Sequence, residues 1–199
     1  MKNIIEFFSQ FNWVDIFVFI VFVRLIFISL KQGLLTEVLK LLGTFSGLYL
    51  SLHYYFSFAS YLNGHSGNKS APGYFLEFFA YLVLFAGGYL VFWLLRILIS
   101  RFVSAEVNPV LSKWGSLISC FLRSVLLVSI ILFALLIPQS MYFKDSIRYS
   151  LSGNSLVKIA PATYTWVWKS IVSKFNSGEK FNNAILDVYS SEPKQIKKK

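Results

Sequence analysis

Four long apolar stretches constrain this chain more than any other feature of its sequence. They cover residues 13–30, 34–61, 74–100 and 115–138, and a helix needs about 20 residues to cross a hydrocarbon core of about 30 Å. None alternates apolar with polar residues, and each is far longer than a buried strand. A spanning helix satisfies its backbone hydrogen bonds internally. The sequence therefore predicts an all-α integral membrane protein, a bundle of about four transmembrane helices.

The composition excludes several other classes of protein. Hydrophobic residues make up 56% of the 199 residues and charged residues 14%, whereas soluble domains have about 45–50% and about 25%. The net charge is +10, but the basic residues flank apolar segments and form no stripe with exposed aromatic residues, so we expect no nucleic-acid binding. Cys120 is the only cysteine, which leaves no intrachain disulfide and no multi-cysteine metal site.

The sequence carries no enzyme motif. It has no His-Glu-x-x-His pattern, no glycine-rich phosphate loop and no Gly-x-Ser-x-Gly elbow, and neither His53 nor His65 has a partner at metal-ligand spacing. Asp15, at the start of the first stretch, has no second aspartate at a similar depth. We therefore expect no catalytic residues, no cofactor and no metal.

The chain changes character after Pro138. Residues 1–138 form the expected membrane domain, and residues 139–199 form a basic C-terminal extension. Within this extension, apolar residues recur at helical spacing over residues 161–175 with lysines on the other face, which predicts an amphipathic helix. Such a helix either lies in the membrane interface or packs on the bundle. The end, residues 190–199, has the composition of a disordered segment.

Small residues at helical spacing predict the faces on which the membrane helices approach each other. Helices in lipid associate through close backbone contact, which small side chains permit. A pore lining or substrate groove is the alternative interpretation. The residues in question are Ser29, Gly33, Gly43, Gly47, Gly115, Ser119 and Ser124. The connection over residues 29–33 is so short that the first two helices are expected to form a tight antiparallel hairpin.

Three charged residues lie at membrane depth: Arg24, Glu37 and Arg123. A charge at the bilayer centre costs at least ~2.5–3.5 kcal/mol, so each needs a partner, water or a route to the interface. Across the expected hairpin, Arg24 and Glu37 differ in depth by about 7 Å, which allows an ion pair between them. Alternatively, both arginines extend towards the same interface as Lys31 and Lys113.

The basic residues near the helix ends predict the orientation in the membrane. Seven lie on the side of the 31–33 turn and the 101–114 connection, and four lie on the other side. Basic residues near helix ends mark the cytoplasmic side, so both termini are expected on the non-cytoplasmic side. The opposing consideration is that the basic tail would suit an anionic cytoplasmic leaflet.

Two parts of the sequence resemble the colicin V production protein (CvpA) family. The first is Asn-Trp-Val-Asp at residues 12–15, the long apolar helix, and the stretch over residues 29–43. The second is Lys-Trp-Gly-Ser-Leu-Ile-Ser-Cys-Phe-Leu-Arg-Ser at residues 113–124. The likeness covers residues 12–138 and extends weakly to the amphipathic helix of the C-terminal extension. Ser29, Ser119 and Ser124 stand where the family usually has glycine, and serine is nearly as small.

The resemblance implies a four-helix protein of the bacterial inner membrane for which no catalytic residues are established. It implies a non-enzymatic role in the production or export of a colicin V-type toxin, or in envelope physiology. The expected partners are the lipid bilayer and other membrane or envelope proteins, and a homo-oligomer is compatible with this role. The alternative function is a small membrane channel or transporter.

Overall fold

A computed structural model of the chain describes residues 12–29, 32–65, 73–102, 109–175, 179–185 and 188. All regular structure in these residues is helical, which confirms the all-α prediction. The long helices are α2 (Trp13–Ser29), α3 (Leu34–His65), α4 (Gly73–Phe102) and α5 (Pro109–Leu136). The shorter ones are α6 (Met141–Tyr149), α7 (Gly153–Leu156), α8 (Ile159–Val167), the π-helical turn η1 (Trp168–Val172) and α9 (Ser173–Phe175). The predicted disordered end, residues 190–199, lies outside the described residues.

Two of these helices are long and apolar enough to cross a membrane. The candidate spans are Gly73–Ile99 in α4 and Ser112–Leu136 in α5, with mean hydropathies of 2.2 and 2.4. Only 6% of the apolar window in α4 is buried, against 61% in α5. A mostly buried apolar helix can be the core of a soluble protein, but an apolar helix exposed on most sides requires lipid or a partner. The exposed surface of α4 is thus the strongest structural indication of a membrane protein.

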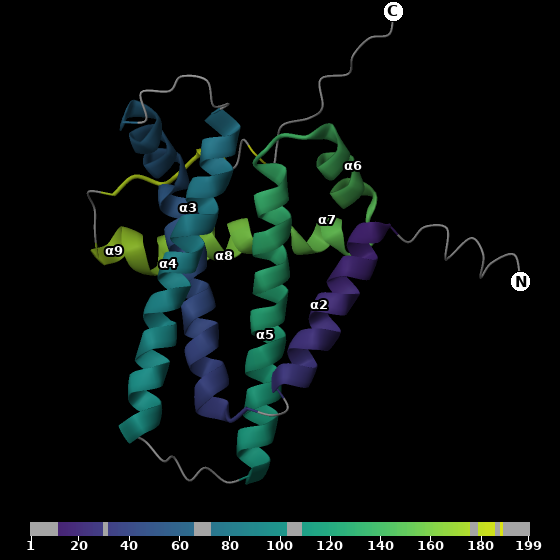
Figure 1. The fold of residues 1–199 in the computed structure, drawn as a ribbon, viewed down its shortest axis with the longest axis vertical. Helices are drawn as coiled ribbons and strands as arrows, with labels where there is room; N and C mark the ends of the chain where they lie inside the picture. Colours follow the sequence, from purple (N-terminus) through teal and green to yellow (C-terminus); the bar gives the residue numbers. More distant parts are fainter. Residues whose placement is uncertain are drawn as a thin grey trace, which may run out of the picture.

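The long helices form a row in the order α4, α3, α5, α2 (Figure 1). α3 packs along α4 and also on α5, whereas α2 packs on α5 and makes no extensive contact with α3. The predicted tight hairpin of the first two membrane helices is therefore wrong. They are joined by a short turn, but α2 inclines away from α3 and both contact α5.

Glycines bring α3 and α4 into backbone contact. A Cβ atom added to Gly47 would lie 2.8 Å from the carbonyl oxygen of Phe85, and one added to Gly88 would lie 2.7 Å from the Cα atom of Gly47. A Cβ atom on Gly43 would lie 3.0 Å from Cβ of Phe92. The structure thus places Gly43 and Gly47 on a packing face and adds Gly88, which the sequence analysis did not select.

The C-terminal extension packs across the long helices. α7, α8 and α9 run roughly perpendicular to them (Figure 1), and α8 contacts both α3 and α5. The predicted amphipathic helix over residues 161–175 corresponds to α8, η1 and α9, and it begins earlier, at Ile159. Tyr164 is fully buried on its inner face, while Trp166 and Ile171 are 62% and 48% exposed. One face therefore packs on the bundle, and the other remains uncovered.

The contact between α3 and α4 predicts different effects for two adjacent glycines. Gly88→Ala should lower the free energy of unfolding by about 1–3 kcal/mol, because the new methyl group meets the backbone of Gly47. Gly87→Ala is the matched control, since a Cβ atom there meets nothing within 4 Å and alanine favours helix by about 1 kcal/mol. Thermal unfolding in detergent measures both. Equal stability of the two variants would contradict the close contact.

Candidate functional site

A buried cluster of charges joins α3 to α5. Glu37 is fully buried, and Arg123 is 3% exposed. Nη2 of Arg123 lies 3.2 Å from Oε2 of Glu37, and Nζ of Lys40 lies 3.1 Å from Oε1 of the same carboxylate. Lys40 also donates a hydrogen bond to the side-chain oxygen of Gln32, in the turn before α3. The carboxylate of Glu37 therefore forms ion pairs with two cations.

The local sequence explains half of this cluster, and the packing explains the rest. Lys40 lies three residues after Glu37, so the two side chains share one face of α3. Arg123 reaches the pair from α5. Its Nε and Nη2 atoms, like Oε2 of Glu37, have no hydrogen-bond partner although they are buried. Desolvating a charge costs several kcal/mol unless hydrogen bonds of good geometry compensate. The missing hydrogen bonds therefore leave part of the desolvation cost of this ion pair uncompensated.

Arg24 does not take part in the cluster. It is exposed on α2, and the described residues give it no carboxylate within ion-pair distance. The predicted Arg24–Glu37 pair is therefore wrong, because α5 lies beside α2 and supplies Arg123 to Glu37. The alternative, in which both arginines extend towards the interface without a partner, is wrong for Arg123, because Arg123 contacts Glu37. Extension of Arg24 towards the interface stays a prediction.

Two of the predicted small residues, Ser29 and Gly115, lie at contacts of α5 with other helices. The hydroxyl groups of Ser29 and Ser116 are 3.2 Å apart, and Cys120 donates to the carbonyl oxygen of Leu25. A Cβ atom on Gly115 would lie 2.7 Å from Leu34. These residues bring α5 against both the end of α2 and the start of α3.

Three further predicted positions, Ser119, Ser124 and Gly33, differ in their burial and contacts. Ser119 and Ser124 are buried on α5, and Ser124 donates to the carbonyl oxygen of Cys120 in its own helix. Gly33 is exposed, and a Cβ atom there meets nothing within 4 Å. The assignment of Gly33 to a packing face is therefore wrong: it belongs to the turn before α3.

A second polar cluster joins α3 to the C-terminal extension. Nδ1 of His53 lies 2.8 Å from the hydroxyl of Tyr164 on α8. The hydroxyl groups of Tyr54 and Tyr49 donate to the two carboxylate oxygens of Glu179, at 2.7 and 3.3 Å. Nε2 of His53 is 3.9 Å from the same carboxylate. Five side chains thus hold the segment after α9 against α3.

Glu179 was missed by the sequence analysis. No local pattern distinguishes it, because its partner Tyr54 lies 125 positions earlier in the chain. The hydrogen bond from Tyr54, followed by the nearby His53 and the hydrogen bond from Tyr49, lowers the pKa of the Glu179 carboxyl below its usual value. Asn182 adds a hydrogen bond of 2.7 Å to the carbonyl oxygen of Leu52.

Asp15 has a structural role. Its Oδ1 atom accepts hydrogen bonds from Oγ of Ser150 at 2.7 Å and from N and Oγ of Ser152 at 2.9 and 2.6 Å. Its Oδ2 atom accepts from the backbone N of Asn12 and of Leu151. The carboxylate therefore fastens the start of α2 to the connection between α6 and α7.

The geometry defines a class of protein. Among the residues that the structure describes, no group of three or more His, Cys, Asp or Glu side chains could hold a metal ion. The polar clusters tether helices to one another, and the apolar helix α4 is largely uncovered. These features are those of a helical membrane protein.

The comparison with protein families assigns the chain within this class. The family model for the colicin V production protein matches residues 14–174. The chain therefore belongs to the colicin V production protein family, as the sequence motifs predicted. The comparisons with curated proteins and with solved structures gave no match.

The buried charge cluster predicts energetic coupling between α3 and α5. Glu37→Gln removes the carboxylate from the buried Arg123 and the partly buried Lys40, and it should lower the free energy of unfolding by about 3 kcal/mol. The double variant Glu37→Gln/Arg123→Gln should lose at least about 1 kcal/mol less than the sum of its single variants. The control pair, Glu37→Gln with Arg24→Gln, should be additive within about 0.5 kcal/mol. Unfolding in mixed micelles measures all of them, and additivity at Arg123 would contradict the pair.

The second cluster predicts a pH-dependent tether. Since the pKa of Glu179 is lowered, its contribution is complete above the usual glutamate pKa and disappears as the pH falls through the lowered value. The protection of residues 179–185 against hydrogen exchange, relative to the intrinsic exchange rate at each pH, should therefore fall at acidic pH, and in Glu179→Gln it should be low at neutral pH. Asp145→Asn, at an exposed carboxylate on α6, is the control. Unchanged exchange in Glu179→Gln would refute this tether.

Proposed function

We propose that this protein is a non-enzymatic component of the bacterial inner membrane that supports the production or export of a colicin V-type toxin, or envelope physiology. It acts by binding partner proteins in the membrane or envelope. The family match over residues 14–174 carries this proposal. The uncovered apolar surface of α4 supports it, because lipid and partner helices are the surroundings that such a surface accepts.

We propose further that α2 and α3 cross the membrane with α4 and α5. The nineteen residue steps from Leu34 to His53 correspond to about 28 Å, close to the thickness of a hydrocarbon core of about 30 Å. His53 contacts α8 through Tyr164, so α8 would lie at the far interface. The exposed Trp166 on α8 suits that position.

A channel or transporter is the second candidate function. The buried Glu37–Arg123 pair favours it, because ionisable side chains inside a membrane domain commonly mark pathways for ions or protons. The two functions differ in what the purified protein does alone. A channel or transporter moves solute in liposomes, whereas a partner-dependent protein does not.

The proposed function predicts a loss of toxin export in cells. Deletion of the gene in a host that makes a colicin V-type toxin should reduce the toxin released while the toxin gene is still transcribed, and the wild-type gene should restore release. Cross-linking in native membranes should recover envelope proteins. Normal release after deletion, combined with ion or solute flux in proteoliposomes, would overturn the proposal in favour of a channel or transporter.

The proposed orientation predicts the accessibility of the helix connections. In a Cys120→Ser background, single cysteines replace Ser66 after α3 and Ser104 after α4. With both termini on the non-cytoplasmic side, a membrane-impermeant thiol reagent should label position 66 but not position 104 on intact spheroplasts. Labelling of position 104 alone would reverse the orientation. Both positions should react in opened membranes, which is the control.

A further inference from the structure

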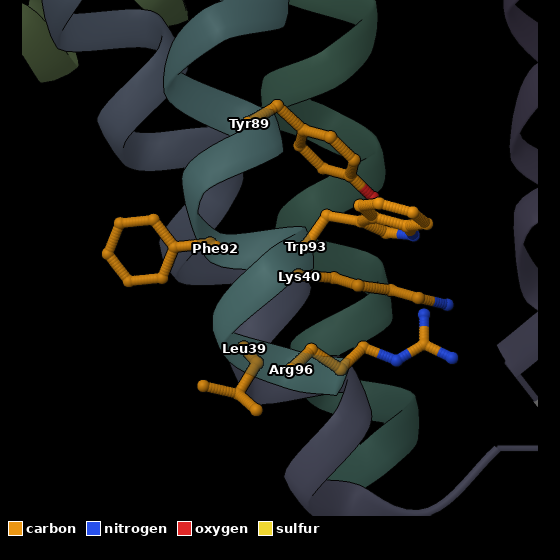
Figure 2. A pocket seen from close by; sticks show the side chains of 6 residues that line it. All are labelled: Leu39, Lys40, Tyr89, Phe92, Trp93 and Arg96. Carbon is orange, nitrogen blue, oxygen red and sulfur yellow. The ribbon is translucent and has the colours of Figure 1, made fainter. Parts of the chain in front are cut away.

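A groove lined by two cations and three aromatic rings lies on α3 and α4. It is lined by Leu39, Lys40, Tyr89, Phe92, Trp93 and Arg96. Figure 2 shows that Lys40 and Arg96 extend to the same side, together with Tyr89 and Trp93, while Phe92 and Leu39 point the other way. The cations and the two rings that carry polar hydrogens thus share one face.

The groove has an excess of positive charge. Among the described residues, Glu37 is the carboxylate beside the groove, and it already contacts both Lys40 and Arg123. Arg96 has no carboxylate within ion-pair distance in the described part of the chain. Lys40, Arg96 and Arg123 therefore outnumber the single anion, and two of these cations belong to the groove. Partly buried cations are stabilised by a neutralising partner, so the groove suits an anion.

The position of the groove in the chain indicates which anion it meets. Arg96 lies three residues before the end of the candidate span Gly73–Ile99, so its long side chain can extend to the phosphate layer of a bilayer. Trp93 is 45% exposed beside it, and Trp and Tyr concentrate at this depth. Basic pockets between membrane helices bind lipid headgroups, and the guanidinium group matches phosphate in a bidentate manner.

The surface of α4 around the groove is apolar. Apolar side chains of Leu90, Val91, Leu94 and Leu98 are exposed on α4 near the groove. Acyl chains that continue from a bound headgroup would find apolar surface there.

We propose that Lys40 and Arg96, with Tyr89 and Trp93, form a binding site for the phosphate group of an anionic phospholipid. The same chemistry would accept free phosphate, and the experiment separates the two sources. This inference rests on the membrane placement of α4 and not on a role in toxin export. Binding to the purified protein and toxin release from cells are separate readouts, so failure of one is distinguishable from failure of the other.

The test uses the full chain, purified in a neutral detergent and titrated with one probe at a time. The probes are dioleoylphosphatidylglycerol, dioleoylphosphatidylcholine and inorganic phosphate. Native mass spectrometry gives the affinity of each, and a shift in the unfolding temperature checks it. Phosphatidylglycerol should bind at least about tenfold more tightly than the zwitterionic lipid, as expected for charge-assisted hydrogen bonds.

The variants locate the site. Arg96→Gln should weaken the binding of phosphatidylglycerol about tenfold, and Arg96→Lys should weaken it less because the charge remains. The matched control, Lys113→Gln, removes an exposed cation of α5 outside the groove and should change the affinity less than about twofold. If Arg96→Gln does not fold, Tyr89→Phe replaces it, with an expected loss of about threefold.

The outcomes separate the proposal from its alternatives. Displacement of the lipid by inorganic phosphate at an equal concentration identifies free phosphate as the ligand, and no displacement identifies the lipid headgroup. Equal binding of the two lipids, without binding of phosphate, overturns the site. Equal losses in Arg96→Gln and Lys113→Gln also overturn it, because they show attraction by diffuse charge.

Discussion

α5 approaches α2 and α3 at the same time because its contact face carries small side chains. Gly115 admits Leu34 at the start of α3, and Ser116 meets Ser29 at the end of α2. Lipid provides no hydrophobic force between helices, so their association depends on close packing and on hydrogen bonds of this kind. Because α5 lies between α2 and α3, Arg123 on α5 is within reach of Glu37 on α3. α4 is then in contact mainly with α3.

The polar groups divide between the two ends of this row of helices. At the end near the 32–33 turn, Glu37, Lys40 and Arg123 form the buried charge cluster, and Arg96 adds a further cation nearby. At the other end, Asp15 and Glu179 fasten the C-terminal extension to α2 and α3. Both sets join segments that are far apart in the sequence.

Much of the fold and part of the candidate site follow from the sequence. The length and continuity of the apolar stretches are local properties, so α2 begins at Trp13 and α5 ends at Leu136, within two residues of the predicted bounds. α5 begins six residues before its predicted start and α3 ends four residues after its predicted end, because both helices continue into more polar sequence. The motifs around Ser29 and Arg123 were sufficient to predict the family that the comparison then confirmed. The sequence also identified Glu37 and Arg123 as charged residues that need a partner, but it did not predict their mutual contact.

The sequence by itself determined which segments are helical, that they are unusually apolar, and where several of the closely packed small residues lie. These depend on interactions over one or two helical turns. Only the tertiary structure decided that Glu37 pairs with Arg123 and not with Arg24, that Gly88 rather than Gly33 makes a backbone contact, and that Glu179 reaches Tyr54. The physical reason is that an ionic partner depends on which helix lies between two others, and no local periodicity specifies that order.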